Sequence, residues 1–542
     1  MLIIKKVIIE NYRLIKRADF RVNPDMNIFV GDNDSGKSTL LEVLSILTSG
    51  KRNGYAFDRQ LKANLFNEEI RKEYIESIED GSNGSPPKII LEAYCENSES
   101  NAKYKGTNNS QAENCPGIRI VVEFDEEYEE PYKEMINNGE IFDIPVEFYK
   151  VSYKYFSGEQ VVFRNCPIKV AYIDTTRKDY SSLVPRFVID NITEFLTQQE
   201  QIDLSTAYRN SRHAFRDNSI VKQLNQSIKE NVNVGNRELA IDIKEGEVDE
   251  WKRQMSLTVD NIPFENIGFG SQNTIKVELA IKNSVAQMNA MLLEEPENNL
   301  SFSNMAKMIH RIVESREKQI FITTHSSYVA NKLDLSKLLL VQNGEVFPFS
   351  DLDSGTINYF KKLPGYDTLR LVLAEKVILV EGATEELLIQ RAYLDKYGKL
   401  PSADGIDVIA VGSLAFKRYC NIALLMRKPI SIVTDNDGNV QENIINKYEG
   451  YLGNELLSFF YETDERLHTI EPSIVSVNLV DGALTESFLK AISRNGSMLR
   501  KNTEEVLNFM KTNKVEWALR VFDSEEKIEY PEHIKNAIKQ YH

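Results

Sequence analysis

Hydrophobic and polar positions in the first half of the chain predict short strands mixed with helices. Strands are expected at residues 2–10, 18–22, 27–30, 88–95, 117–124, 146–156 and 169–173, and a helix at residues 37–47. The polar segment 98–111 is typical of a solvated insertion. From Leu183 to Val234 the pattern is helical and rich in Gln, Asn and Arg. A helical insert between two halves of an α/β core favours a subunit interface, and a cap on the same subunit is the alternative.

The second half repeats the alternation of apolar strands and helices. A helix is expected at residues 275–288, and strands are expected from Met291 and at residues 319–323, 377–380, 406–411 and 429–433. The connector 335–367 carries Gly344, Gly355 and Pro364-Gly365, which indicate a domain boundary. We therefore predict an α/β protein with one domain at residues 1–174 and 256–365, a helical insert at residues 175–255, and a second domain at residues 366–542.

Composition narrows the class of protein. The chain has 542 residues, of which 42% are hydrophobic and 27% charged, so it has the length for two or three globular domains. No run of residues predicts a membrane span or a secretory signal, and the four cysteines lack metal-site spacing, so a cytoplasmic protein is expected. The net charge of −16 averages over local patches and includes any carboxylates that hold metal, so it does not exclude a nucleic-acid partner.

A phosphate-binding motif lies between a predicted strand and a predicted helix. Residues 31–39 read GDNDSGKST and fill the G-x-x-x-x-G-K-S/T frame. The glycines let backbone N–H groups approach the phosphates, Lys37 reaches the β/γ oxygens, and Ser38 can hold Mg²⁺. We expect ATP with one Mg²⁺ here, bound by Gly31, Asn33, Gly36, Lys37, Ser38 and Thr39.

Further segments resemble ABC ATPases of the SMC/RecF-like branch. The turn Asn11-Tyr12-Arg13 precedes the phosphate loop, and the run 267–274, IGFGSQNT, resembles the ABC signature that reaches the γ-phosphate of an opposite subunit. Ser271 is its expected contact. The resemblance implies two heads that sandwich ATP, and therefore a homodimer or a higher homo-oligomer.

The same resemblance implies roles for acids after the strand that begins at Met291. Glu294 would sit beside Mg²⁺, and Glu295 would polarise the attacking water. His325, in Thr-Thr-His-Ser-Ser, stands where ABC ATPases keep the histidine that faces the γ-phosphate.

A second group of acids follows the strands of the C-terminal domain. Glu381 ends strand 377–380, and Glu385 lies one turn into the next helix, facing back toward it. Asp435 and Asp437 follow strand 429–433 and, in extended chain, point to the same side. Open α/β sheets bind ligands at this edge, and four carboxylates there repel one another unless hard cations neutralise them. The sequence therefore predicts a site for Mg²⁺ or Mn²⁺.

This E-G-x-x-E … D-x-D arrangement is similar to the Toprim pattern. With Glu471 in Thr-Ile-Glu-Pro and Lys514 in Lys-Val-Glu-Trp-Ala, the whole chain resembles the OLD (overcoming lysogenisation defect) family of nucleases, which includes the large subunit of Gabija anti-phage systems. The resemblance implies an ABC-type (SMC/RecF-like) ATPase head with an inserted helical dimerisation arm, followed by a C-terminal Toprim α/β domain. It also implies two Mg²⁺ or Mn²⁺ ions on Glu381, Glu385, Asp435, Asp437 and Glu471, with Lys514 neutralising charge in the transition state.

The expected function is an ATP-regulated, metal-dependent DNA endonuclease or nickase that acts against phage or other foreign DNA. Its expected partners are DNA, a second copy of the chain, and a helicase or reverse transcriptase (retron) encoded alongside. The chain has 24 tyrosines but no spare segment long enough for the DNA-gate domain of a topoisomerase, so water is the expected nucleophile. The alternative is an SMC/RecF-like ATPase clamp that binds DNA or a partner protein and uses a non-catalytic Toprim domain as a docking platform.

Overall fold

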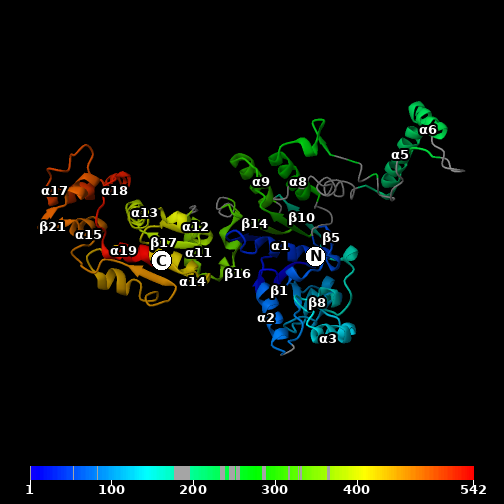
Figure 1. Cartoon of the computed structure of the whole chain (residues 1–542), viewed down its shortest axis with the longest axis horizontal. Helices are drawn as coiled ribbons and strands as arrows, with labels where there is room; N and C mark the ends of the chain where they lie inside the picture. The colour runs from blue at the N-terminus through cyan, green and yellow to red at the C-terminus, as the bar shows by residue number, and fades with distance from the viewer. Residues whose placement is uncertain are drawn as a thin grey trace. The chain divides into compact units, whose positions relative to one another are not determined.

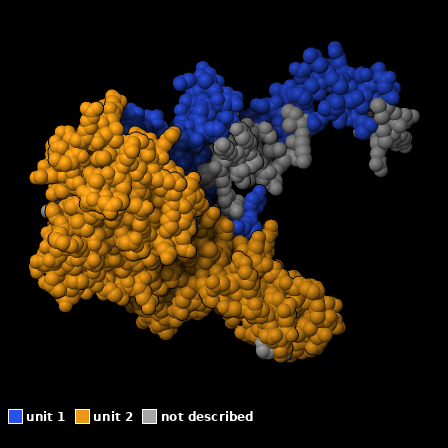
Figure 2. Space-filling model, turned by 60° about the vertical axis from the view of Figure 1, so that its left-hand side comes forward, with its two compact units in different colours: residues 1–3, 48–60, 162–322 blue, residues 4–47, 61–161, 323–542 orange. Residues whose placement is uncertain are grey.

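The structure is a computed structural model that describes residues 2–52, 54–81, 84–175, 196–231, 239–242, 251, 255, 257–283, 289–314, 318–326, 329, 333–362 and 367–542. Its contacts divide the chain into two compact units (Figure 2). The first unit contains residues 1–3, 48–60 and 162–322, and the second contains residues 4–47, 61–161 and 323–542. Each unit is therefore assembled from segments that are far apart in the sequence.

An antiparallel sheet opens the second unit. Its strands are β1 (Ile4–Tyr12), β2 (Ile15–Arg21), β6 (Ile89–Cys95), β7 (Lys105–Gly106), β8 (Cys115–Phe124) and β9 (Tyr149–Tyr155). They pair in the order β2-β1-β6-β8, and both β7 and β9 pair with β8. On β2, Ala18 and Phe20 are buried while Asp19 is exposed, which is the two-residue period of a sheet with one covered face. Helices α2 (Glu68–Glu79) and α3 (Glu129–Asn138) are joined by the hydroxyls of Tyr74 and Tyr132, 2.7 Å apart.

The segment 98–111, expected to be a solvated insertion, packs against this sheet. Tyr104 is buried, with its ring centroid 4.6 Å from that of Tyr155 on β9. The backbone N–H and the hydroxyl of Ser110 each donate to Oε1 of Glu92 at 2.9 Å. Glu92 is a fully buried carboxylate of β6, and a buried carboxylate needs donors in place of water. The expectation was wrong because polar groups of this segment donate hydrogen bonds to the buried Glu92 and are not only hydrated by solvent.

The phosphate loop follows the parallel strand β3 (Met26–Val30) and leads directly into α1 (Lys37–Ser49), as predicted. β3 pairs in parallel with β15 (Leu338–Gln342), which turns back antiparallel to β16 (Glu345–Pro348). Asn343 and Gly344 make this turn with φ angles of 50° and 79°. An Asn-Gly pair adopts these positive angles at little cost, which is why it is typical of two-residue hairpins.

The first unit holds residues 256–322 of the second ATPase segment. Strands β10 (Val170–Asp174) and β13 (Ala290–Glu294) are parallel, and β14 (Gln319–Thr324) follows β13 in the strand order. Helix α9 (Phe302–Glu314) is joined to α8 (Phe269–Asn283) by an ion pair between Arg311 and Glu278. The other strands here are short: β4 (Lys51–Arg52), β5 (Tyr55–Ala56), β11 (Thr258–Val259) and β12 (Ile262–Pro263).

Helix α8 begins at Phe269, earlier than the predicted start at Ile275. The glycine and serine of the signature-like run are therefore inside its first turn. Gln272 explains the early start, because its side chain donates to the backbone oxygens of Glu265 and Ile267 and fixes the chain that enters the helix. The expected end at Met288 lies outside the described residues.

The helical insert is described over α5 (Gln198–Asp217) and α6 (Ser219–Asn231). Thr197 and Glu200 form a capping box at the start of α5, which satisfies the free N–H groups there. Neither helix contains a buried residue, and Ile202, Phe215 and Ile220 are exposed. The rest of the predicted helical stretch, residues 183–195 and 232–234, lies outside the described residues. Among the helices that are described, none has the length and apolar character needed to cross a membrane.

The C-terminal domain is a parallel sheet covered by helices. Its strands β17 (Lys376–Val380), β18 (Ile406–Ala410), β19 (Ile430–Val433) and β20 (Leu457–Phe460) lie in the order β18-β17-β19-β20. Val377 to Val380 are all buried, as expected for a parallel strand with both faces covered. The helices are α12 (Asp367–Leu373), α13 (Ala383–Tyr397), α14 (Phe416–Leu425), α15 (Ile470–Val477), α16 (Glu486–Ala491), α17 (Thr503–Thr512), α18 (Lys514–Asp523) and α19 (Glu532–Lys539), with a hairpin of β21 (Leu479–Val480) and β22 (Ala483–Leu484) (Figure 1).

Helix α11 (Ser354–Lys362) is attached to this domain through α14. Asp353, which precedes α11, accepts hydrogen bonds from Arg418 at 3.1 Å and from Asn421 at 2.9 Å. The ring centroids of Phe360 and Tyr419 are 5.3 Å apart. The residues on either side of the predicted boundary at 365 and 366 lie outside the described part of the chain.

Candidate functional site

The phosphate loop has the local geometry that its motif predicts. Lys37 is 4% exposed, and its Nζ donates to the backbone oxygens of Gly31 at 3.1 Å and Asp32 at 2.7 Å. A Cβ at Gly31 would lie 2.1 Å from the backbone oxygen of Val341 on β15, so only glycine fits there. Gly36 has a φ of 110°, which favours glycine. The motif residues Asn33 and Ser38 are exposed, and Thr39 is buried.

His325 lies beside this loop. Burial lowers its pKa from the ordinary value, and the nearby Lys37 ammonium lowers it further, while Asp32 acts in the opposite direction. The imidazole is therefore neutral at pH 7. A neutral ring can accept a hydrogen bond from water or donate one to a phosphate oxygen. The structure places His325 near Lys37.

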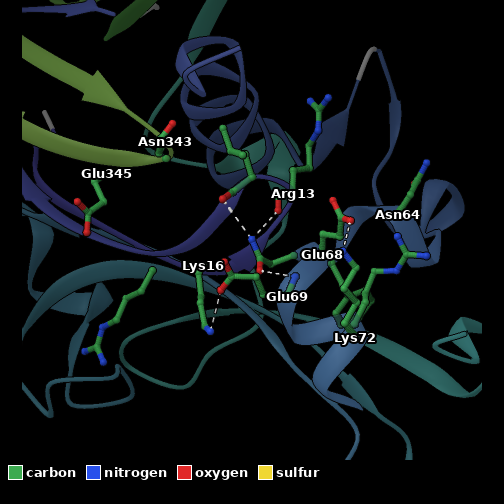
Figure 3. Close-up of a pocket in the computed structure, with 14 residues that line it drawn as sticks. Arg13, Lys16, Asn64, Glu68, Glu69, Lys72, Asn343 and Glu345 are labelled. Atoms are coloured by element: carbon green, nitrogen blue, oxygen red, sulfur yellow. Dashed lines mark hydrogen bonds and ion pairs between the residues drawn. The ribbon is translucent and has the colours of Figure 1, made fainter. Parts of the chain in front are cut away.

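A pocket of about 970 Å³ lies next to the phosphate loop (Figure 3). The backbone N–H of Gly344, which lines the pocket, donates to the backbone oxygen of Ser35 at 2.9 Å. Arg13 lines it from the β1–β2 turn, and Lys16 projects toward Glu69 from β2, with 3.0 Å between Nζ and Oε2. Arg13 belongs to the Asn-Tyr-Arg turn that precedes the phosphate loop, but the sequence does not predict this pocket. Its walls come from three segments far apart in the chain, and no local pattern indicates that they meet.

Glu294 ends β13 in the first unit, Glu295 follows it directly, and both are buried. The hydroxyl of Tyr172 donates to Oε2 of Glu294, and the hydroxyl of Thr175 donates to the backbone oxygen of Glu294 at 2.9 Å. Glu295 has a φ of 45°, a left-handed conformation that turns its side chain out of the strand direction. The carboxylate of Glu294 is thus held by Tyr172 on β10, and the backbone of both acids is held by Thr175, which follows β10.

The signature-like segment contacts the turn that follows these acids. The side chain of Asn273 in α8 donates to the backbone oxygen of Asn298 at 2.9 Å. A Cβ at Gly270 would lie 2.5 Å from the backbone oxygen of Asn299, so the glycine allows close packing. Ser271 is exposed on the first turn of α8. Ser271, Glu294 and Glu295 are in the first unit, whereas the phosphate loop and His325 are in the second.

The predicted acids of the C-terminal domain follow the carboxyl ends of its strands. Glu381 comes directly after β17, and its Oε1 accepts from the hydroxyl of Thr434 at 2.7 Å and from the N–H of Asp435 at 3.2 Å. Glu385, in the first turn of α13, accepts from the N–H of Gly382 at 2.9 Å and so caps its own helix. Two parallel strands and one helix end thus deliver three carboxyl groups to one edge of the sheet.

Electrostatics shows that the five predicted acids form one cluster. Burial raises the pKa of Asp435 to about 8, and the carboxylates of Glu385, Glu381, Glu471 and Asp437 add to the rise. Burial likewise raises the pKa of Glu385 to about 7, with Glu381 and Glu471 adding to it. Like charges raise one another's pKa only at short range. The structure therefore brings together all five acids that the sequence singled out.

Asp437 reaches this cluster through a turn and not through extended chain. Its φ is 48°, and its N–H donates to the backbone oxygen of His468 at 3.1 Å. Asn436 is fully buried, and its side chain donates to the backbone oxygen of Glu462 at 2.7 Å while accepting from the N–H of Gly438 at 2.8 Å. This Asx turn is the physical reason that the expected extended geometry is wrong, although the two aspartates still face the same cluster.

The chemistry of this cluster fits a hard divalent cation. Glu471 is 1% exposed, and its Oε2 accepts from the hydroxyl of Thr469 at 2.8 Å. Its Oε1 is buried and has no hydrogen-bond partner. A buried carboxylate oxygen without a donor is costly, and a cation among neighbouring carboxylates would remove that cost. In the described part of the chain, no three His, Cys, Asp or Glu side chains are already arranged to hold a metal ion.

Lys514 is not brought to this cluster. It is exposed at the first residue of α18. Within the described residues, no hydrogen bond or ion pair links Lys514 to any of the five acids. The Lys-Val-Glu-Trp-Ala motif instead places Trp517, a fully buried residue, in the hydrophobic core of the domain.

A buried histidine lies beside Glu462, which is hydrogen-bonded to the helix that carries Glu471. His533 in α19 is 8% exposed, and its Nδ1 lies 3.8 Å from Oε2 of Glu462. The same Oε2 accepts from the hydroxyl of Ser473, two residues after Glu471, at 3.3 Å. Burial lowers the pKa of His533 to about 4, while Glu462 acts in the opposite direction. His533 is therefore neutral in the folded protein at pH 7.

This histidine makes acid-dependent unfolding a testable prediction. The ordinary pKa of His533 is 6.5, so between pH 6.5 and about 4 the unfolded state binds a proton that the folded state excludes. Stability is therefore present above pH 6.5 and falls by up to roughly 3 kcal/mol as the pH decreases toward 4. We expect His533→Gln to flatten this part of the profile, measured as Tm against pH by tryptophan fluorescence. Equal slopes for the parent and the variant would contradict the prediction.

Comparisons with known proteins identify two domains. The model of the AAA ATPase domain family matches residues 2–330, and the model of the TOPRIM domain of overcoming lysogenization defect protein-like proteins matches residues 372–437. The second match includes Glu381, Glu385, Asp435 and Asp437. ATPase and TOPRIM domains generally use ATP and divalent metals. No curated protein matches the chain.

Several solved structures are similar to part of this chain. The SMC head domain from Thermotoga maritima is 12% identical, with a TM-score of 0.29, covering 64% of this chain and 98% of that one. The recombination mediator protein RecF with ATP is 10% identical, with a TM-score of 0.33, covering 64% of this chain and 98% of that one. An Smc head bound to the C-winged helix domain of ScpA is 13% identical, with a TM-score of 0.34, covering 64% and 96%.

The two family matches confirm the predicted fold class and the predicted resemblance. The N-terminal ATPase domain and the C-terminal TOPRIM domain are present in the predicted order, and the structure is mixed α/β. The ATPase match alone covers more than half of the chain. The chain belongs to the AAA ATPase domain family and carries an OLD-like TOPRIM domain, a combination that matches the OLD family of ABC ATPase–Toprim proteins.

Proposed function

We propose that this protein is a metal-dependent DNA endonuclease or nickase whose cleavage is regulated by its ATPase domain. The observation that carries the proposal is the cluster of five carboxyl groups at the edge of the TOPRIM sheet, of which all but the exposed Asp437 are buried or half-buried. Two of them have strongly raised pKa values, and the buried Oε1 of Glu471 lacks a partner. Such crowding of carboxylates disfavours folding unless bound cations neutralise their charge. The OLD-like TOPRIM domain supports a nuclease-type function.

The five acids would hold Mg²⁺ or Mn²⁺. Two divalent ions in such a site supply a hydroxide nucleophile and neutralise the leaving oxygen of a phosphodiester. Glu381 is oriented by Thr434 and the N–H of Asp435, so one of its oxygens is fixed by the protein. Glu385 is fixed at the start of α13 by the N–H of Gly382. These bonds hold the ligands in place before DNA arrives.

Lys514 would balance charge on the scissile phosphate. It lies exposed at the start of α18, so DNA can reach its ammonium without any change in the core. An exposed lysine pairs with phosphate as a point charge and pays little desolvation. In this proposal Lys514 contacts the DNA directly and does not contact the acids.

The ATPase domain would bind ATP on the loop 31–39, with Lys37 on the phosphates and Ser38 on the accompanying Mg²⁺. His325 would contact the γ-phosphate, Glu294 would lie on the metal side, and Glu295 would activate water. The pocket beside the loop has the polar walls and the volume suited to the base and ribose of the nucleotide. A second copy would supply its own Ser271, and α5 with α6 would form a dimerisation arm, since their apolar residues are exposed.

Defence against phage or other foreign DNA, in the cytoplasm and with a helicase or reverse transcriptase as partner, follows in this proposal from OLD family membership. The alternative function is an ATPase clamp with a non-catalytic TOPRIM domain. It is favoured by one observation, that the described acids are not already arranged as a metal cage.

The products of plasmid cleavage test the proposal. We expect supercoiled plasmid, incubated with the protein and Mg²⁺ or Mn²⁺ with and without ATP, to become nicked and linear. Because water is the proposed nucleophile, detergent and phenol extraction should leave this DNA in the aqueous phase with 5′-phosphate and 3′-hydroxyl ends that ligase can join. Protein-linked ends or relaxed closed circles would assign the chain to the strand-passing enzymes. Intact plasmid under all conditions, with ATP still bound, would support the clamp.

A further inference from the structure

Tyr448 is a buried tyrosine beside the acid cluster whose hydroxyl has no hydrogen-bond partner. Buried tyrosine hydroxyls normally find one, so this group is either a cost or a part of a site. Tyr448 follows a π-helix at Gln441–Asn446, and its backbone N–H donates to the oxygen of Ile444 at 2.9 Å. π-helical turns insert an extra residue, which turns the following side chains to a new direction, and they are frequent at functional sites.

The ring of Tyr448 is fixed in the core next to the strand that carries the aspartates. Its centroid lies 5.0 Å from that of Phe459 on β20, and Phe459 pairs with Ile432 on β19. The hydroxyl lies close to the side chain of Thr434, which follows β19, but does not form a hydrogen bond with it. The phenol is buried near the carboxylate of Glu381, and its hydroxyl can donate one hydrogen bond.

The hydrogen bonds to Glu381 use only one of its two oxygens. Thr434 Oγ1 donates to Oε1 at 2.7 Å, and the N–H of Asp435 donates to the same oxygen at 3.2 Å. Among the described residues, no donor is bonded to Oε2. Thr434 has given its only proton to Glu381, so its oxygen can act only as an acceptor for a further donor. The Tyr448 hydroxyl is a buried donor close to this side chain.

We propose that Tyr448 is a positioning residue that donates to Thr434 and thereby fixes Glu381 with Oε1 on the protein and Oε2 toward a cation. A small rotation of the phenol or of Thr434 completes the chain from Tyr448 to Thr434 to Glu381. Hydrogen bonds in such a chain strengthen one another, and partners behind metal ligands typically change metal affinity by about 10- to 100-fold. This inference rests on the cation site of the proposed function.

The test is Mn²⁺ binding to the full, nucleotide-free chain, measured by calorimetry without DNA. The sites of interest are defined as those lost in Asp435→Asn. We expect Tyr448→Phe, which removes only the hydroxyl, to weaken this binding about 10-fold, and Thr434→Val to weaken it by about 10- to 100-fold. Thr434→Ser keeps the hydroxyl and should restore parental affinity. Because the two groups form one chain, the double variant should bind no more weakly than Thr434→Val alone.

Tyr451→Phe is the matched control. Tyr451 lies in the same segment, and its hydroxyl donates to Asn421 Oδ1 at 2.8 Å, away from the acids. It should leave Mn²⁺ affinity unchanged. Parental affinity in Tyr448→Phe, additive losses in the double variant, or an equal loss in Tyr451→Phe would each overturn the inference. A parent that binds Mn²⁺ but leaves plasmid intact would instead overturn the endonuclease proposal and leave this inference standing.

Discussion

Asp435→Asn is expected to abolish DNA cleavage while leaving ATP binding intact. Asp435 is the acid whose pKa is raised by all four of the others, so it faces every member of the cluster. Groups that act as one catalytic unit lose most of their effect when any one is removed, and we expect a loss of about 10⁴-fold. The measurement is the rate of plasmid nicking with Mg²⁺ or Mn²⁺. ATP binding, measured with a fluorescent analogue, should not change because the phosphate loop is built from other segments.

Stability separates this prediction from simple misfolding. In metal-free protein, Asp435 holds a proton up to about pH 8 in the folded state but releases it near pH 4 in the unfolded state. Its contribution therefore falls as the pH rises from about 4 to 8, and the neutral Asn variant should melt at the same temperature as the parent or higher at pH 8. Asp523→Asn, at an exposed acid on the end of α18, is the control and should cleave like the parent. A less stable Asp435→Asn that still cleaves would contradict the role.

Lys37→Ala is expected to lose nucleotide binding. Lys37 is buried, and its ammonium is already directed to the mouth of the loop by the backbone oxygens of Gly31 and Asp32. Removing a buried charge that binds phosphate costs about 3 kcal/mol, which weakens ATP binding by about 100-fold. Titration with a fluorescent ATP analogue measures the change.

Two other variants serve as controls for the loss of ATP binding. Lys62→Ala removes an exposed lysine and should bind ATP like the parent. Glu295→Gln should also keep ATP bound but hydrolyse it slowly, because it removes only the proposed water-activating group. Unchanged ATP affinity in Lys37→Ala, or parental hydrolysis in Glu295→Gln, would show that these residues were assigned to the wrong roles.

Sequence alone predicted those parts of the site that are local. The loop 31–39 and the acids after β17 and β19 each follow a strand within a few residues, and strand ends of a parallel sheet share one edge. The motif therefore predicted both the residue types and their meeting point. Glu471 was found by the Thr-Ile-Glu-Pro motif, and the structure places it in the same cluster.

What sequence could not predict depends on contacts between distant segments. The walls of the pocket beside the loop come from the β1–β2 turn, the start of α2 and the β15–β16 turn. Segment 98–111 is not simply solvated, because it supplies hydrogen-bond donors to the buried carboxylate of Glu92. No sequence motif marks Tyr448, since a tyrosine that only fills the core and a tyrosine whose hydroxyl supports a site residue look the same in a sequence. Long-range packing decides such cases.

The pairing of β3 with β15 has a consequence for synthesis on the ribosome. Ile28 lies opposite Leu338, and the turn at Asn343 and Gly344 closes against the phosphate loop through Ser35. A nascent chain that has only its first 300 or so residues outside the ribosome therefore carries the complete nucleotide motif but lacks the neighbouring strand that shapes it. The nascent chain therefore becomes competent to bind ATP only after β15 and the turn at Asn343 and Gly344 have left the ribosome. At that stage nearly half of the second unit has emerged, and translation of the TOPRIM acids is about to begin.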